Sequence, residues 1–379
     1  MPFSARQGFF TVGTSEPIYD WPGYMNASVF TAEVTNDFTG SGIYTGSKVT
    51  VGSMGYRGGI LADNGNIYMC PRQQTNMLEL DPSDDSFTKI SLSGVSSNEY
   101  TGGMLASNGN IYCPAFNSGT KILEFEPSTG NNFEVVPNTS HGNYYLNTRN
   151  IGGCTLPSGN VMFQPRNSGG SFTNYDPVTN KPIKAGTKSL SMDFEYMGCV
   201  PHPNGNVYVM PFNGGKVSYF NESTDTWTDV DVSSVVGSQA CQGGVIMADG
   251  RICGVPYASN GIFVFDPSDD SFYLDTYGTS WSTSSQSYIG GALGADGNIY
   301  FANFNLTSGE EHIFDTQANT VIRNTGIVHN TQNNVGAVAA PNGHVYFVAD
   351  SGNDSAKKDT TGTATNGEVL KSPHMNKGF

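Results

Sequence analysis

The hydrophobic positions of this chain recur in a unit of four short apolar stretches separated by polar turns. In its first clear copy the stretches are residues 58–62, 66–70, 77–80 and 87–90. The last two alternate apolar and polar side chains, which is typical of strands with one solvated face. Asp63-Asn64-Gly65, after the first stretch, is typical of a tight hairpin because Asn and Gly accept positive φ. The pattern predicts four antiparallel strands, a to d.

A pair of glycines marks each copy of the unit. One glycine leads the first apolar stretch, and the second belongs to the hairpin turn seven residues later. The leading glycines are Gly58, Gly102, Gly152, Gly198, Gly243, Gly290 and Gly336, and the turn glycines are Gly65, Gly109, Gly159, Gly205, Gly250, Gly297 and Gly343. Successive turn glycines are 44, 50, 46, 45, 47 and 46 residues apart. Strand-rich repeats of about 40 to 50 residues predict the blades of a β-propeller, whose innermost strands need glycine for close approach.

Seven copies predict one all-β domain over residues 28–350, a seven-bladed β-propeller of four-stranded antiparallel blades. The seventh copy loses the pattern after Tyr346, while residues 29–39 imitate outer strands. We therefore expect N-terminal strands to complete the last blade and close the ring. In the alternative, residues 367–370 form strand c of that blade and the N-terminus supplies only strand d. Residues 1–27 are expected to form an N-terminal arm and residues 351–379 a C-terminal tail.

Aromatic side chains hold fixed registers in the repeat. Tyr68, Tyr112, Tyr208, Tyr300 and Tyr346 share one position, and Phe87, Phe133, Trp227 and Phe272 share another. Buried periodic aromatics are typical of packing between sheets. We expect these rings to build the fold rather than to form a ligand platform.

Composition and charge narrow the classes of partner. The formal net charge is -15 and the pI is near 4.6, whereas nucleic-acid surfaces carry clustered Lys and Arg, so no nucleic-acid partner is expected. No apolar stretch approaches the roughly 18 residues of a membrane span, and the first residues lack the order of a secretory signal, so no membrane insertion is expected.

The six cysteines lie mostly inside predicted strands, where a thiol behaves as a small hydrophobe. We expect free core thiols; pairing in an oxidising environment is the alternative. The cysteine spacings match neither CxxC nor Cys/His metal pairs, so no metal and no cofactor is expected.

The order of strand a, hairpin turn, Asn-Ile-Tyr, loop, apolar strand, Asp-Pro turn and aromatic resembles the kelch-type and related seven-bladed propellers. Residues 65–68 and 80–87 carry this resemblance, which covers about residues 28–350. It implies four-stranded blades around a central channel. The chain departs from the kelch pattern after strand b, where a double glycine is replaced by Cys70-Pro71, Cys113-Pro114, Gln164-Pro165 and Met210-Pro211.

The opening Met1-Pro2-Phe3-Ser4-Ala5-Arg6-Gln7-Gly8-Phe9-Phe10 is similar to the starts of structural proteins of tailed bacteriophages. Richness in Gly, Asn, Ser and Thr is similar to virion fibres and decoration proteins. This resemblance implies a virion component, as a tail, fibre or capsid-decoration protein, made in the host cytoplasm; a cytoplasmic protein is the alternative. The arm or the tail would then dock on other virion or assembly proteins.

The two faces of the predicted propeller carry different loops. The face of the a-to-b and c-to-d turns collects Asp63, Asp84, Asp85, Asp249, Asp269, Asp270 and Asp296, which we interpret as turn formers because no Asp-x-Asp-x-Asp loop with a closing Glu appears. The face of the d-to-a and b-to-c loops carries Tyr, Trp and Asn, which suit recognition of glycans or receptor surfaces. The candidate ligand-binding residues there are Tyr144, Tyr145, Tyr196, Trp281 and Tyr288.

A propeller enzyme, a lyase or hydrolase acting at the channel, is the alternative function. A lyase of the streptogramin-inactivating type would use His and Glu near the channel, where His141, Glu99 and Glu195 are candidates. His329 is the other histidine on a predicted loop of that face. A copper oxidase of the galactose-oxidase type would need two His and two Tyr that converge. No ordered motif joins such residues, so we assign no catalytic residue.

Overall fold

The structure is a computed structural model that describes residues 55–96, 100–116, 121–135, 149–277, 287–304, 310–325, 334–349 and 356–359. Every named element in these ranges is a β-strand. The first sheet contains β1 (Tyr56–Leu61), β2 (Ile67–Pro71), β3 (Asn76–Asp81) and β4 (Ser86–Ser91). The second contains β5 (Met104–Leu105), β6 (Ile111–Pro114), β7 (Ile122–Glu126) and β8 (Asn131–Val135). The third contains β9 (Asn150–Thr155), β10 (Val161–Pro165), β11 (Ser171–Asp176) and β12 (Lys181–Ser189).

The remaining sheets repeat this organisation. The fourth contains β13 (Tyr196–Pro201), β14 (Asn206–Pro211), β15 (Lys216–Asn221) and β16 (Thr226–Asp231). The fifth contains β17 (Cys241–Ile246), β18 (Ile252–Pro256), β19 (Ile262–Asp266) and β20 (Ser271–Asp275). The sixth contains β21 (Tyr288–Leu293), β22 (Asn298–Asn303), β23 (Glu310–Asp315) and β24 (Thr320–Thr325). The last contains β25 (Asn334–Ala339), β26 (His344–Ala349) and β27 (Ala356–Asp359).

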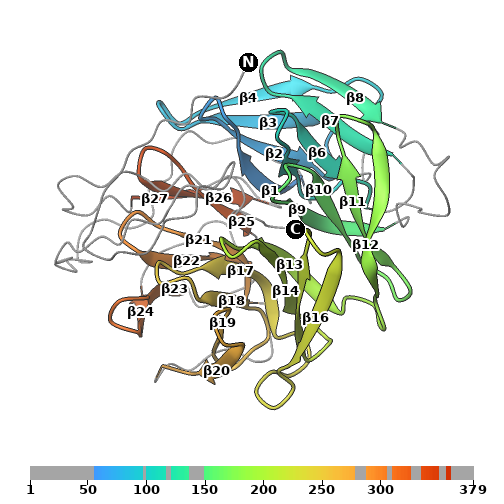
Figure 1. The fold of residues 1–379 in the computed structure, drawn as a ribbon. Coiled ribbons are helices and arrows are strands. Elements are labelled where there is room, and N and C mark those ends of the chain that lie inside the picture. The colour runs from blue at the N-terminus through green and yellow to red at the C-terminus, as the bar shows by residue number, and fades with distance from the viewer. Residues whose placement is uncertain are drawn as a thin grey trace, which may run out of the picture.

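The sheets form a propeller ring. In each sheet, neighbours in sequence pair antiparallel, and the first strands of successive sheets contact one another from β1 through β25. Strand β25 in turn lies against β1, and Figure 1 shows the sheets arranged around a common centre. The predicted all-β propeller of four-stranded antiparallel blades is confirmed. Six blades have all four strands among the described residues, and the seventh has three.

Strand c of the seventh blade comes from the C-terminal side. β27 pairs antiparallel with β26, with His344 opposite Asp359. This strand lies within residues 351–379, which were expected to form a tail, and it takes the place of strand c, which was expected from the N-terminal segment or from residues 367–370. β27 follows β26 along the chain and pairs with it, as the third strand follows and pairs with the second in the other blades. The predicted arm, the N-terminal closing strands and residues 367–370 lie outside the described residues.

The leading glycines form a repeated bulge at the start of each innermost strand. All seven have positive φ, from 54° at Gly102 to 128° at Gly336. The strand register slips beside six of them, for example between Arg57 and Gly59. A Cβ on Gly198 would lie 2.6 Å from the Cα of Gly243 in the next blade. Glycine is therefore required there both by backbone conformation and by the close approach of two strands.

The tyrosines of the first aromatic register are buried and pack between blades, as predicted, whereas Phe133 of the second register is 53% exposed. The ring centroids of Tyr68 and Phe125 are 5.3 Å apart, and those of Tyr208 and Phe265 are 5.7 Å apart. Each pair joins two neighbouring blades. The equivalent tyrosine of the seventh blade joins the last blade to the first, because Tyr346 Oη donates a hydrogen bond of 2.8 Å to Asp85 of the first blade.

The acidic residues of the turn face act as turn formers. Asp84 Oδ1 accepts from the Ser86 amide at 2.9 Å, and Asp269 Oδ1 accepts from the Ser271 amide at 2.9 Å. Among the described residues, no group of three or more His, Cys, Asp or Glu side chains is placed to hold a metal ion. The sequence-based interpretation of these two carboxylates is confirmed.

Two of the six cysteines form a disulfide, which corrects the expectation that all are free. Cys70 on β2 is bonded to Cys113 on β6, across 43 residues of sequence. Gly103 on the neighbouring innermost strand leaves room for the pair, since a Cβ there would lie 2.5 Å from Cys70 Sγ. The buried Cys154, Cys199, Cys241 and Cys253 are free thiols.

Hairpin turns use one side chain to hold the tyrosine of strand b. In four blades this residue is an asparagine whose Nδ2 donates to the tyrosine Oη at 2.8 Å: Asn64, Asn108, Asn204 and Asn342. In the sixth blade Asp296 takes this place and accepts from Tyr300 Oη at 2.6 Å. Burial raises the pKa of the Asp296 carboxyl above its usual value.

Asp296→Asn is expected to raise the free energy of unfolding at pH 7 by roughly 1 kcal/mol, because it restores the neutral amide of the other blades. A carboxyl whose pKa is raised by folding stabilises the protein fully at low pH, and this contribution is lost as pH rises through the folded-state pKa. The advantage of the variant should therefore grow from pH 4 to pH 7 in chemical denaturation. Asp249→Asn is the control, since Asp249 has the same place in the fifth blade but pairs with Arg251. A loss of stability in Asp296→Asn at pH 7 would count against this account.

Candidate binding site at the channel mouth

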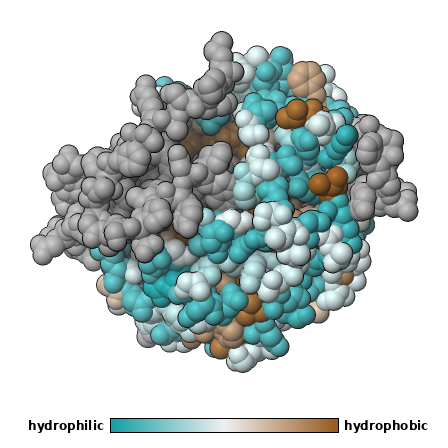
Figure 2. All heavy atoms as spheres, in the orientation of Figure 1, coloured by the Kyte–Doolittle hydropathy of each residue, from teal (hydrophilic) through white to brown (hydrophobic). Residues whose placement is uncertain are grey.

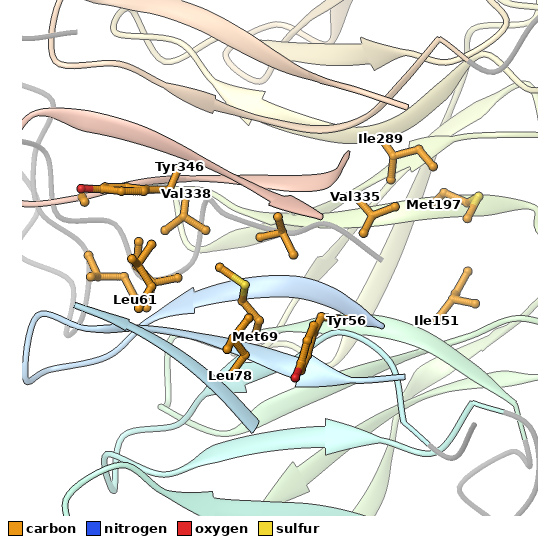
Figure 3. Close-up of a cluster of buried hydrophobic side chains, with 14 of the residues drawn as sticks. Tyr56, Leu61, Met69, Leu78, Ile151, Met197, Ile289, Val335, Val338 and Tyr346 are labelled. Carbon is orange, nitrogen blue, oxygen red and sulfur yellow. The ribbon is translucent and has the colours of Figure 1, made fainter. Parts of the chain in front are cut away.

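The residues directly before the leading glycines form an inner ring around the channel: Arg57, Thr101, Ile151, Met197, Gln242, Ile289 and Val335. Four of them, Ile151, Met197, Ile289 and Val335, belong to one buried cluster although they come from four different blades. Figure 3 shows these four side chains close together at the inner ends of their strands. Apolar side chains from four blades therefore pack together at the centre of the ring.

The three other members of the inner ring are polar. Thr101 is 0% exposed and Gln242 is 4% exposed. Thr101 Oγ1 and Gln242 Oε1 have no hydrogen-bond partner among the described residues. Burial raises the pKa of Tyr257, in the fifth blade, to about 12. The positive charge of Arg57, in the first blade, opposes this rise. The positive charge of Arg57 therefore acts on a residue of a blade that is not its neighbour.

A second ring follows the ends of the b strands, on the face of the b-to-c and d-to-a loops. Its six described members share one repeat position, seven residues after a turn glycine: Arg72, Phe116, Arg166, Phe212, Tyr257 and Phe304. Asp350 has this position in the seventh repeat and lies outside the described residues. Backbone bonds fix this position, as when the Arg72 amide donates to Gly55 O and the Arg166 amide donates to Arg149 O, both at 3.0 Å. Phe116, Phe212 and Tyr257 pack in the same cluster as the apolar channel residues, so this ring surrounds the mouth of the channel. In the space-filling view of Figure 2, hydrophilic residues make up most of the visible described surface, with a few hydrophobic residues scattered among them.

Arginines and aromatic rings of this region stack in a continuous series. The guanidinium carbon of Arg72 lies 5.0 Å from the ring centroid of Phe116. That of Arg166 lies 5.2 Å from Phe116 and 4.8 Å from Phe194. The Phe194 ring continues to Phe212 at 6.3 Å, and Phe212 to Tyr257 at 5.3 Å. We call these six residues the mouth arc; cation–π contacts hold its arginine planes in place.

Phe194 joins the arc through an unusual backbone conformation. Its φ is 52°, in the left-handed region that costs a bulky residue about 1–3 kcal/mol. The Phe194 amide donates to Arg166 O at 2.8 Å, and its carbonyl accepts from the Asn213 amide at 3.2 Å. These bonds hold the strained residue between the third and fourth blades. Such strain is common at functional sites, and here it accompanies an aromatic ring whose centroid lies 4.8 Å from the Arg166 guanidinium carbon.

The mouth concentrates positive charge in an acidic chain. Arg57, Arg72, Arg149 and Arg166 are four of its seven arginines, whereas the formal net charge is -15. Burial and then the positive charge of Arg149 lower the pKa of Arg166, while Asp193 opposes them. No carboxylate of the described residues lies within ion-pair distance of Arg166. Positive charge attracts anions, and Arg57 and Arg72 also have contacts of their own.

Two of the five predicted ligand-binding tyrosines and tryptophans are buried in strands, which corrects their placement on exposed loops. Tyr196 starts β13 with 0% exposure, and its Oη bonds to Ser218 Oγ at 2.8 Å. Tyr288 starts β21 with 1% exposure and bonds to His312. Tyr56 and Tyr100 occupy the same repeat position, two residues before the leading glycine, so these rings are structural. Tyr144, Tyr145 and Trp281 lie outside the described residues.

The candidate catalytic residues do not meet at the mouth in the described part of the chain. His202 Nε2 bonds to Gly250 O at 2.8 Å on the turn face, and His312 is buried beside Tyr288. Glu195 Oε2 accepts from the Ser191 amide at 2.5 Å. Glu99, His141 and His329 lie outside the described residues. A search of the described residues for a helix able to span a membrane finds none.

Comparison with known proteins supports the fold. No family model and no curated protein sequence matches the chain. Among solved structures it is similar to virginiamycin B lyase from Staphylococcus aureus, with a TM-score of 0.65, 13% identity, and coverage of 82% of this chain and 98% of the lyase. It is also similar to YCF48 bound to a D1 peptide, with a TM-score of 0.63, 10% identity, and coverage of 85% and 98%. At these identities the likeness shows a β-propeller.

Proposed function

We propose that this propeller is an interaction module that binds a ligand through the mouth of its channel. The observation that carries the proposal is the mouth arc, in which Arg166 is held between Phe116 and Phe194 above an apolar channel floor. Concave sites with an apolar floor and a few oriented polar groups are typical of ligand binding. The strain at Phe194 supports a functional role, because strained backbone conformations cluster at functional sites.

Reversing the charge of the arc should abolish binding. Glycan arrays and host-cell surfaces are probed with the wild-type protein and with Arg72→Glu/Arg166→Glu, and we expect at least a tenfold loss in the variant. Lys89→Glu/Lys184→Glu is the matched control, because it changes the net charge equally on outer strands β4 and β12. If the arc variant keeps the full binding of the wild type, the mouth is not the binding face.

We also propose an extracellular assembly, such as a phage particle, as the setting of this module. The resemblance of the first ten residues to phage structural proteins supports this, as does the Cys70–Cys113 disulfide, since disulfides persist in oxidising environments. In that setting the mouth face would meet a host surface while other parts of the chain dock on the particle. We expect antibodies to detect the protein in gradient-purified particles. We expect it to be absent from host-cell cytosol once the cells are lysed and the particles removed.

The alternative, a lyase or hydrolase at the channel, is favoured only by the likeness in fold to an enzyme, virginiamycin B lyase. No histidine among the described residues belongs to the mouth arc. Turnover of a candidate substrate that is lost on changing His141 or His329 would favour the enzyme over the binding module.

A further inference from the structure

We propose that residues 37–42, in the N-terminal part of the chain, form the fourth strand of the seventh blade by pairing with the open edge of β27. This inference goes beyond the proposed function and does not depend on it. It rests on three observations: β27 has one partner among the described strands, the turn that would follow it is unfavourable, and the chain enters the first blade from the face on which such a strand would end.

Strand β27 has an open edge in the described part of the chain. It pairs with β26, and no described strand lies on its other side. In each of the six complete blades that place is taken by a strand d, for example β4 beside β3. An open edge presents unpaired backbone N–H and C=O groups that can pair with another strand. The seventh blade therefore has a place for one more strand.

The residues that follow β27 are poorly suited to the turn into strand d. In the six complete blades, four residues separate strand c from strand d, and the fourth of them has positive φ. These fourth residues are Asp85, Gly130, Asn180, Asp225, Asp270 and Asn319. After β27 the same place is occupied by Thr363, and a β-branched residue rarely adopts positive φ. The strand beside β27 is therefore expected to come from elsewhere in the chain.

The N-terminal segment approaches the seventh blade from the right direction and at the right distance. In the other blades strand d ends on the mouth face and leads into strand a of the next blade, and β1 is the strand a that follows the seventh blade in the ring. In the first blade strand d starts at Ser86, 16 residues before the next leading glycine. In the second blade it starts at Asn131, 21 residues before the next leading glycine, and the other four blades lie within these limits. The same interval counted back from Gly58 places the start between residues 37 and 42.

The sequence at the beginning of this interval repeats the beginning of a strand d. Residues 37–39 are Asp-Phe-Thr, whereas β4 begins Ser-Phe-Thr and β16 begins Thr-Trp-Thr. The aromatic residue of β16 faces the preceding blade, since Trp227 Nε1 donates to Ala185 O at 2.7 Å. Phe38 would therefore pack towards the sixth blade. The first and last segments of the chain would then share one sheet, which closes the ring.

The repeat also predicts the register of the new strand. Lys357 of β27 takes the place of Glu79 of β3, because each is opposite the tyrosine of strand b. Thr88 is opposite Glu79 in the first blade, so Thr39 should be opposite Lys357 in the seventh. Because strand d begins at the turn face, the predicted N-terminal arm would leave the disc there. The arm and the channel mouth would then lie on opposite faces.

A cross-link tests this register. Opposite residues of antiparallel strands lie within the Cα separation that a disulfide requires, so Thr39→Cys/Lys357→Cys should form an intrachain disulfide on mild oxidation of the folded protein. Mass spectrometry of proteolytic peptides measures its yield. Thr39→Cys/Ser372→Cys is the matched control and should form much less. The pairing is overturned if the two variants give equal yields, or if the bond joins two copies of the chain.

Deletions test the contribution of the strand to stability. Removing residues 1–45 should lower the urea midpoint of unfolding by about 1 M or more, whereas removing residues 1–27 or 360–379 should leave it unchanged. A synthetic peptide of residues 30–48, added to the first of these variants, should raise its midpoint again, and the same peptide with Phe38→Asp should not. If only the deletion of residues 360–379 lowers the midpoint, the fourth strand comes from the C-terminal side and the proposal is wrong.

Hydrogen exchange gives a test that needs no folded deletion variant. In the full-length protein, amides of residues 37–42 should exchange at least tenfold more slowly than those of residues 361–372, because backbone pairing protects them. Equal exchange rates in the two segments would overturn the proposal.

One charge pair in the predicted register is unfavourable and gives a further test. Asp37 would be opposite Asp359, as Ser86 is opposite Asp81 in the first blade. Like charges directly opposite each other destabilise a strand pair. Asp37→Asn should therefore raise the urea midpoint slightly. A midpoint that is unchanged or lower would overturn this register.

Discussion

Replacing Gly198 by alanine is expected to lower the free energy of unfolding by about 3 kcal/mol or more. A side chain at φ +90° costs about 1–2 kcal/mol, because Cβ then approaches the neighbouring carbonyl oxygen. The new Cβ would also lie 2.6 Å from Gly243 Cα, a backbone atom that can move only if the innermost strand of the fifth blade moves. Overpacking of this kind adds about 1–3 kcal/mol. Denaturant unfolding followed by circular dichroism measures the loss.

Two other glycines separate the two causes. Gly205 has φ +86°, but no atom lies within 4 Å of the place where its Cβ would stand, so Gly205→Ala should show only the conformational cost. Gly237 has open space and no positive φ, so Gly237→Ala should be nearly neutral. If Gly198→Ala and Gly205→Ala lose the same free energy of unfolding, the close approach of β13 and β17 adds nothing to the cost of a side chain at Gly198.

The strands were predictable because their signals are local. The second strand was expected over residues 66–70 and lies at Ile67–Pro71, and the fourth was expected over 87–90 and lies at Ser86–Ser91. Alternation of side chains and an Asn-Gly turn determine such bounds within a few residues. The bulge at the leading glycines was not predicted, although glycine was expected there for close approach, because a bulge changes register without changing the hydrophobic pattern.

The candidate site was harder to predict because its residues are adjacent only in the ring. Arg72, Phe116 and Arg166 are more than 40 residues apart in sequence and meet at the mouth through equivalent ends of b strands. Alignment of the repeats does carry this signal, since all three stand seven residues after a turn glycine. The same alignment puts Tyr196 and Tyr288 in register with Tyr56 and Tyr100, which indicates structural tyrosines rather than loop residues.

The pairing of Cys70 with Cys113 had no local signature. Their spacing of 43 residues matches no short cysteine motif, and the pairing depends on how closely the second strands of two neighbouring blades approach. Side chains that point between blades can be recognised from the repeat, but their distance is set by the packing of residues such as Gly103. The disulfide therefore follows from tertiary structure, as the mouth arc does.

Removing this disulfide should have an effect as large as the change at Gly198. A bond that closes about 43 residues restricts the unfolded chain and stabilises the folded state by about 4 kcal/mol on the loop-entropy account. Cys70→Ala/Cys113→Ala should lose this amount in chemical denaturation, beyond the loss of packing. Cys154→Ala/Cys253→Ala is the matched control, because it removes two buried sulfurs that form no disulfide.

The disulfide also bears on the mouth, because Arg72 and Phe116 follow its two cysteines closely in sequence. The bond holds the first and second blades together close to the stack of these two residues. Ligand binding by Cys70→Ala/Cys113→Ala should therefore weaken severalfold under conditions where the variant is still folded, whereas the control pair should bind as the wild type does. If the two double variants have the same unfolding free energy, the cross-link between these blades does not contribute to stability. If they bind the ligand with the same affinity, the stack of Arg72 and Phe116 is held without the disulfide.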